Sequence, residues 1–129
     1  MSIKVEEVIE AYKKTGLRPI QDEWFGRYRG RGNCACALTA IVIEKDPPFL
    51  QDLTKEDAVD EIDMDGVMNA QLGLSYAYIK GFTRGFDGYH TVGDLKVKVE
   101  NQEDLLRGFE DGKAIWKAVK KEFHLFQEV

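Results

Sequence analysis

The residues with the clearest capacity for chemistry lie between positions 27 and 36, where the sequence reads RYRGRGNCAC. Arg27, Arg29 and Arg31 lead directly to Asn33, after which we expect a buried helix to begin. Arginine side chains and the N–H groups of a helix N-terminus both attract anions. These four residues are therefore candidates for binding phosphate or carboxylate, and the simpler alternative, which the sequence favours, is a solvated basic loop.

Cys34 and Cys36 follow the arginines at a spacing of two. In a first helical turn beside positive charge, the Cys34 thiol would have a lowered pKa and would be reactive. A hydrolase would also need a base near Cys34 or Cys36, for which His90 and His124 are the available residues. The alternative is that both cysteines fill the core as free thiols, because their spacing disfavours a mutual disulfide. The sequence favours this alternative, and with it a protein that is not an enzyme.

Metal chemistry is not indicated by the sequence. Two cysteines at a spacing of two and two scattered histidines lack the paired spacing of zinc ligands. The segment EIDMDG is similar to the start of a calcium-binding loop, but Glu61 stands at its first position and Leu72 where a bidentate glutamate is needed. We therefore expect no metal and no cofactor.

A cluster of acidic side chains surrounds the segment EIDMDG. It predicts a solvated helix face, and its alternative role is to bind a basic protein partner or, weakly, a divalent cation. Its members are Asp52, Glu56, Asp57, Asp60, Glu61, Asp63 and Asp65.

The elements that must position these residues belong to a chain of 129 residues, which fits a single domain over residues 1–129. A hydrophobic fraction of 43% and only three prolines are typical of a soluble globular protein. The net charge of −5 disfavours nucleic-acid binding, although residues 27–31 could form a local basic patch. The acidic, helix-like N-terminus is unlike a signal peptide and no apolar run approaches the roughly 20 residues of a membrane helix, so we expect a cytoplasmic protein.

Hydrophobic spacing predicts about five helices, of which two lie in the first 45 residues. The first has one apolar face, with Ser2 as its cap and Gly16 as its end. Residues 17–33 contain three glycines and no steady period, so we predict a long ordered loop there. Residues 34–45 are apolar almost all round a helical wheel, which favours a buried helix, with a buried strand over 39–43 as the alternative.

The middle of the chain predicts a short acidic helix and one isolated strand. The pattern Thr54-x-x-Asp57 is a capping box that would open the helix. At residues 95–99, apolar side chains alternate with lysines, which is typical of a half-buried strand. Such a strand would pair with an extended piece of residues 17–33, or the segment is an extended connection without a partner.

Two further helices have clear start and stop signals. Gly73 predicts the end of a turn over 67–72, and Ser75 is placed to cap a helix over 76–86. Asn101 predicts the start of the last and longest helix, which runs to about residue 123.

Glycines at a spacing of four interrupt both of these helices. Gly81 and Gly85 in the earlier helix recur as Gly108 and Gly112 in the last one, 27 positions later, and all four lie on the buried side of a helical wheel. A glycine inside a helix costs about 1 kcal/mol relative to alanine, so the four cost on the order of 4 kcal/mol. We therefore predict that the two helices pack glycine face to glycine face, and the alternative is that the glycines make room for a ligand.

The segments YIKGFTRGFDG and GFEDGKAIWKAV, together with KKTGLRPIQ and CACALTAI, resemble a set of small, uncharacterised bacterial proteins. This resemblance implies a self-contained fold and brings no activity with it.

The sequence thus predicts a mainly α domain of about five helices, with a close glycine-mediated helix pair and one minor β element. Its best functional interpretation is a small cytosolic binding or interaction protein, in which the acidic helix and the arginine-rich loop are candidate surfaces for a protein partner. One alternative is a small-anion binding protein or an enzyme that uses the arginine loop and Cys34. The other is nucleic-acid binding through residues 27–31.

Overall fold

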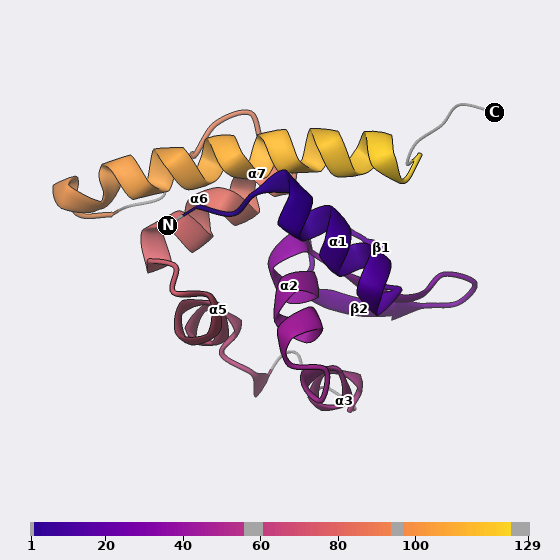
Figure 1. Cartoon of the computed structure of the whole chain (residues 1–129). Helices are drawn as coiled ribbons and strands as arrows, with labels where there is room; N and C mark the ends of the chain where they lie inside the picture. The colour runs from indigo at the N-terminus through magenta and orange to yellow at the C-terminus, as the bar shows by residue number, and fades with distance from the viewer. Residues whose placement is uncertain (1, 56–60, 94–96, 125–129) are drawn as a thin grey trace.

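A computed structural model of the chain describes residues 2–55, 61–93 and 97–124, and it confirms the mainly α class. Within these residues there are six α-helices, a short 3-10 helix and a three-stranded sheet (Figure 1). The helices are α1 Val5–Thr15, α2 Ala37–Lys45, α3 Phe49–Thr54, α5 Met64–Leu72, α6 Tyr76–Phe86, η1 Val99–Asn101 and α7 Gln102–Glu122. The strands are β1 Arg18–Pro19, β2 Phe25–Tyr28 and β3 Gly32–Ala35. None of the described helices combines the length and the apolar character needed to cross a membrane.

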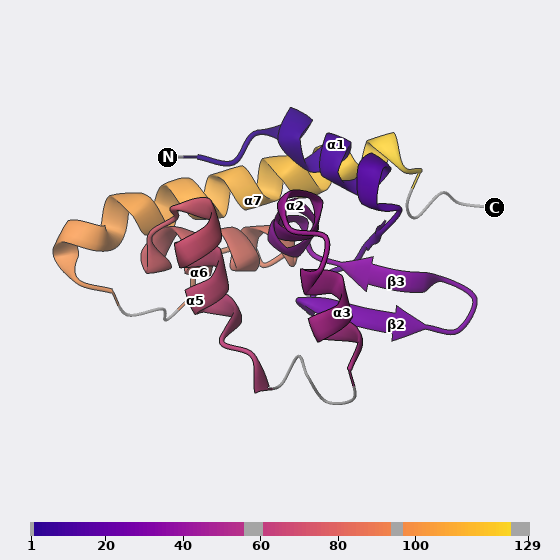
Figure 2. The ribbon, with the colours of Figure 1, turned by 60° about the horizontal axis from the view of Figure 1, so that its bottom comes forward.

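Helices α6 and α7 lie side by side and run parallel. Gly81 faces Leu105 and Phe109, and one turn later Gly85 faces Phe109 and Lys113, so both helices advance in the same direction along their contact. Figures 1 and 2 show the two helices adjacent in both views. The glycine-bearing face of each helix is therefore buried against that of the other.

The four glycines let the two backbones touch. A Cβ atom added at Gly81 or Gly85 would lie 2.0 or 2.1 Å from a backbone oxygen of α7. A Cβ atom at Gly108 or Gly112 would lie 2.2 Å from a backbone oxygen of α6. Carbon and oxygen atoms cannot approach so closely, so only glycine fits. The predicted glycine-mediated pair is confirmed, and no space remains between these faces for a ligand.

The core surrounds helix α2. Its residues 37–43 are all buried, which follows from their apolar character on every side of the helix. Helices α1, α3 and α5 pack against it, and one continuous cluster of buried side chains extends from there to α6 and α7. The prediction of a helix rather than a strand at 39–43 is therefore confirmed.

The loop predicted at residues 17–33 is wrong, because this segment forms most of the sheet. Strand β3 lies between β1, which pairs with it in parallel, and β2, which pairs with it in antiparallel orientation. Strands β2 and β3 form a hairpin with the three-residue connection Arg29, Gly30 and Arg31, which Figure 2 shows projecting from the helices. Gly30 and Gly32 have φ values of +83° and +77°, which glycine adopts without strain.

The start of α1 differs from the prediction that Ser2 caps it. The helix begins at Val5 with Lys4 at the N-cap, and the Glu7 carboxylate accepts a hydrogen bond of 3.2 Å from the Lys4 N–H. Ile3 is buried, and its N–H donates to the Tyr78 hydroxyl at 2.9 Å. These two contacts hold residues 2–4 outside the helix, so Ser2 cannot reach the first helical turn.

The later helix boundaries mostly agree with the sequence. Gly73 ends α5 in a left-handed conformation, the Ser75 side chain caps α6 by accepting from the Tyr78 N–H, and Asn101 precedes α7. The acidic helix expected after Thr54 falls largely on residues 56–60, outside the described residues. The strand expected at 95–99 lies partly outside them too, and its described part is extended chain and the start of η1.

The α6–α7 contact generates a stability prediction. In Gly85→Ala the added Cβ would meet the Phe109 carbonyl oxygen, which cannot move without displacing α7. We expect the variant to lose about 3 kcal/mol or more of unfolding free energy, at the upper end of what overpacking costs. Urea denaturation followed by circular dichroism would measure this loss.

Gly66→Ala is the matched control. Its added Cβ would meet only the flexible Asp63 carboxylate at the start of α5. The gain in helix propensity and the disturbed cap nearly cancel, so we expect a change within about 1 kcal/mol. Equal losses in the two variants would contradict the backbone contact as the cause.

Candidate anion-binding pocket

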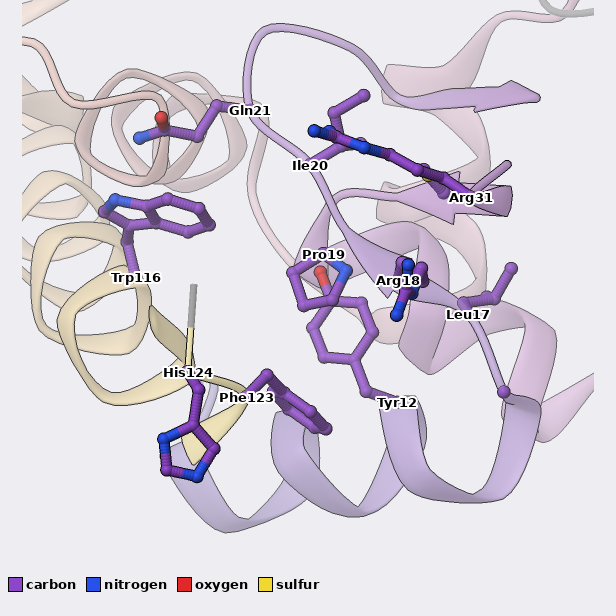
Figure 3. A pocket seen from close by; sticks show the side chains of 12 residues that line it. Tyr12, Leu17, Arg18, Pro19, Ile20, Gln21, Arg31, Trp116, Phe123 and His124 are labelled. Carbon is purple, nitrogen blue, oxygen red and sulfur yellow. The ribbon is translucent and has the colours of Figure 1, made fainter. Parts of the chain in front are cut away.

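A cavity of about 620 Å³ lies where the end of α1, strand β1, the tip of the hairpin and the end of α7 meet (Figure 3). Its strand side is formed by Arg18, Pro19, Arg31 and Cys34. Its helix side is formed by Tyr12 of α1 and by Trp116, Phe123 and His124 at the end of α7. The cavity therefore has cationic groups on one side and aromatic rings on the other.

The sheet brings the two arginines of the pocket together. The parallel pairing of β1 with β3 places Arg18 directly beside Cys34, and Ile20 extends the pairing by donating its N–H to the Ala35 carbonyl at 3.2 Å. Arg31 comes from the hairpin turn, where its N–H donates to the Tyr28 carbonyl at 3.0 Å. The backbone that carries each of these two arginine side chains is therefore held in place by hydrogen bonds.

The segment after β1 is fastened to the end of α6. The Gln21 side chain donates from Nε2 to the Phe86 carbonyl at 2.9 Å, and the Asp22 N–H donates to Oδ1 of Asp87 at 2.8 Å. Burial raises the pKa of the Asp87 carboxyl, and the Asp22 N–H opposes this rise. These bonds fix β1, and with it Arg18, relative to the α6–α7 pair.

The aromatic wall comes from the part of α7 that extends beyond α6. Trp116 packs edge to face on Phe86 with ring centroids 5.1 Å apart, and Phe123 packs in the same manner on Tyr12 at 5.7 Å. The Tyr12 hydroxyl donates to the Ala35 carbonyl of β3 at 2.8 Å. Three rings are thus held in fixed orientations between α1, α7 and the sheet.

The electrostatics of the pocket favour an anion. Arg18 and Arg31 are exposed, and no carboxylate among the described residues forms an ion pair with either of them. Burial raises the pKa of the Cys34 thiol, and the charges of Arg31 and Arg18 oppose that rise. The Glu23 carboxylate adds to the rise of this pKa, so one negative charge lies near the pocket without forming an ion pair with either arginine. The thiol is neutral near pH 7 and adds no further negative charge.

The structure does not bring together the four residues that the sequence predicts for an anion site. Arg31 lines the pocket, but Arg27 and Arg29 lie on the hairpin outside it, and Asn33 lies in β3 opposite Arg27. The predicted helix start after Asn33 is wrong, because that segment forms a strand and α2 begins at Ala37. The helix N-terminus that was expected to assist the arginines is therefore elsewhere.

The cysteines do not have the environment that a nucleophile needs. Cys34 lies in β3 instead of a first helical turn, and its pKa is raised, so the predicted lowering is wrong. Cys36 precedes α2, its Sγ lies 3.3 Å from the Thr39 hydroxyl, and burial raises its pKa to about 11. His90 is exposed and does not line the cavity with Cys34, whereas His124 does. The alternative of buried free thiols is the one that the structure supports.

Part of the acidic cluster serves local structure. Asp63 caps α5 by accepting from the Gly66 N–H at 3.1 Å, and Asp52 pairs with Lys55 at 3.7 Å. Glu56, Asp57 and Asp60 lie outside the described residues. In the part of the chain that the structure describes, no three histidine, cysteine or acidic side chains are grouped so that they could hold a metal ion.

Sequence reasoning missed most of the pocket. Arg18, Trp116 and Phe123 come from a two-residue strand and from the end of a long helix, and no local pattern marks them as neighbours. The hairpin had a usable signal, since Gly30 and Gly32 lie on either side of Arg31 between two short runs, and a short loop that contains glycine is typical of a hairpin. That signal would have placed Arg31 at a turn beside a strand.

Comparison of the chain with known proteins does not indicate a ligand for the pocket. No protein-family model matches the chain, and neither a curated protein nor a solved structure matches it. The ligand has to be inferred from the residues of the pocket, and the resemblance to small bacterial proteins stays a prediction.

The raised thiol pKa values predict slow labelling of the native protein. Thiolate is the reactive form, and a pKa of about 11 for Cys36 against an ordinary 9.0 lowers its thiolate fraction at pH 7 about 100-fold. We expect its labelling rate to rise with pH and to level off only near pH 11. Mass spectrometry after timed reaction with a maleimide would measure the rates.

The variants Cys34→Ser and Cys36→Ser assign each rate to one residue. Cys34 should react faster than Cys36, because it lines the cavity and its neighbouring arginines oppose the rise of its pKa. Labelling of Cys34 at the rate of a free peptide thiol would contradict both its burial and the rise of its pKa.

Proposed function

We propose that this protein binds a small organic anion in the cavity between α1, the sheet and α7. The observation that carries the proposal is the convergence of Arg18 and Arg31, from separate segments, on one cavity of about 620 Å³. Ligand pockets in proteins typically enclose about 300 to 1,000 Å³, with a few polar groups on a mostly apolar lining. The size of this cavity lies within that range, and its lining combines several polar groups with aromatic and apolar side chains.

Guanidinium groups favour carboxylate and phosphate ligands. Their planar arrangement of N–H donors matches two oxygens of such a group, and charge-assisted hydrogen bonds of this kind are roughly twice as strong as neutral ones. Arg18 and Arg31 make no ion pair among the described residues, so a ligand would supply the missing negative charge. The protein is thus proposed as a small-ligand binder.

The competing functions have weaker support. An enzyme that uses Cys34 is disfavoured by the raised pKa of this thiol. Nucleic-acid binding would use all the arginines of the hairpin, including Arg27 and Arg29, on a protein with a net charge of −5. Binding of a protein partner remains the second candidate, through Arg27 and Arg29 or the acidic cluster.

The cytoplasm is the compartment that we propose, since thiols such as Cys34 persist where conditions are reducing.

Replacement of the pocket arginines tests the proposal. We expect acetate and inorganic phosphate to shift the NMR signals of residues that line the cavity. In Arg18→Gln and Arg31→Gln the dissociation constants should rise about tenfold or more, because each variant loses a charge-assisted hydrogen bond. Titration followed by two-dimensional NMR would measure both constants.

Arg29→Gln is the matched control, because it removes the same charge from the same hairpin outside the cavity. We expect it to leave the binding of both anions nearly unchanged. If all three variants weaken binding equally, the overall positive charge of the sheet and its hairpin is responsible and the pocket is not the site. A duplex DNA that binds wild type and loses affinity in Arg29→Gln would favour nucleic-acid binding instead.

A further inference from the structure

The cavity is much larger than the group that the two arginines would bind. A carboxylate or an inorganic phosphate would fill only a small part of about 620 Å³, since one water molecule accounts for about 30 Å³ of liquid. The remaining volume extends from the guanidinium groups toward the end of α7. A ligand that fills the site therefore has a body as well as a charged group.

The walls around that remaining volume carry three aromatic rings, beside the polar side chains of Gln21 and His124. Figure 3 shows Arg18 and Arg31 on the strand side, with Trp116 and Phe123 facing the same space from α7. Tyr12 lies between the two sides, and its hydroxyl is already used by the Ala35 carbonyl. Its ring therefore adds apolar surface to the middle of the cavity.

The rings are also rigid. Trp116 is held edge to face on Phe86 with an interplanar angle of 72°, and Phe123 is held on Tyr12 at 74°. Aromatic pairs favour such edge-to-face or offset geometries, and a bound ring extends the same packing. Binding a flat ligand would require little further ordering of these side chains, which favours affinity.

We propose that the ligand is an aromatic acid, which is an arene that carries one carboxylate or phosphate group. The charged group binds between Arg18 and Arg31, and the ring packs against Trp116 and Phe123. This inference rests on the proposed anion site and adds the chemical class of its ligand. An aliphatic acid of equal size would bury similar apolar area but would fit the ring surfaces less well.

A series of defined ligands tests the ring. We expect phenylacetate to bind at least about tenfold more tightly than acetate, and phenyl phosphate to exceed inorganic phosphate by a similar factor, because the ring is removed from water. Comparison of these two aromatic ligands decides between carboxylate and phosphate as the charged group. Cyclohexylacetate should bind more weakly than phenylacetate, and phenethylamine, which carries a cation on a similar skeleton, should not bind. Calorimetric or NMR titration gives each constant.

The variant Phe123→Leu separates the ring contact from the anion contact. It keeps an apolar side chain at the end of α7 and removes the ring from the wall. We expect it to weaken phenylacetate about fivefold, within the range that aromatic pairing contributes, and to leave acetate unchanged. The midpoint of thermal unfolding of the variant, measured alongside, would show whether the fold is retained.

Trp116→Phe provides a second test. It keeps a ring at this position, so only phenylacetate binding should change, and only slightly.

The outcomes distinguish the two proposals. If phenylacetate binds no more tightly than acetate, while acetate still depends on Arg18, the aromatic class is wrong and the anion site stands. If cyclohexylacetate equals phenylacetate, the ligand is an apolar acid without a required ring, which also overturns the inference. If none of the anions shifts the signals of the cavity, the proposed function itself fails.

Discussion

A methyl group at any of four positions in α6 and α7 would lie within 2.2 Å of a backbone oxygen of the other helix. This contact sets the distance between the two helices and their register, and its residue pairing shows that they run parallel. The loss of helix propensity at four glycines, on the order of 4 kcal/mol, is offset by the close packing of two backbones and of the rings beside them. Helix α1, the buried helix α2 and the sheet are then arranged around this pair.

The register also decides where a cavity can form. Helix α6 ends at Phe86, which lies beside Gly112, whereas α7 continues to Glu122. The extension of α7 has no α6 to cover it, so it packs on α1 and contributes Trp116 and Phe123 to the pocket. The bonds from Gln21 and Asp22 to the end of α6 bring the strand side of the pocket to the same place. The register of the α6–α7 contact thus determines which part of α7 is left to line the cavity.

The sequence predicted what depends on neighbouring residues and missed what depends on distant ones. The glycine pair, the buried α2 and the caps at Gly73 and Ser75 follow from spacing and local sterics, and all are confirmed. The sheet was missed because its strands are two to four residues long and are held by each other. Arg31 was predicted to bind an anion partly because a helix N-terminus was expected beside it, and the structure places that helix start elsewhere. The position of Arg18 at the cavity could not be read from the sequence, because it depends on the β1–β3 pairing and on the end of α7.

The part of α7 beyond the end of α6 presents its pocket residues on a side of the helix that is fixed relative to the glycine face. Each residue of an α-helix turns the chain by about 100°, so Trp116, four residues after Gly112, projects from nearly the same side of α7 as the glycine does. Adding or removing a single residue between them would leave the helix pair intact and would rotate both Trp116 and Phe123 away from the cavity. The length of chain between these two positions is therefore constrained as strictly as the glycines themselves, in addition to the apolar character that the buried Ile115 requires.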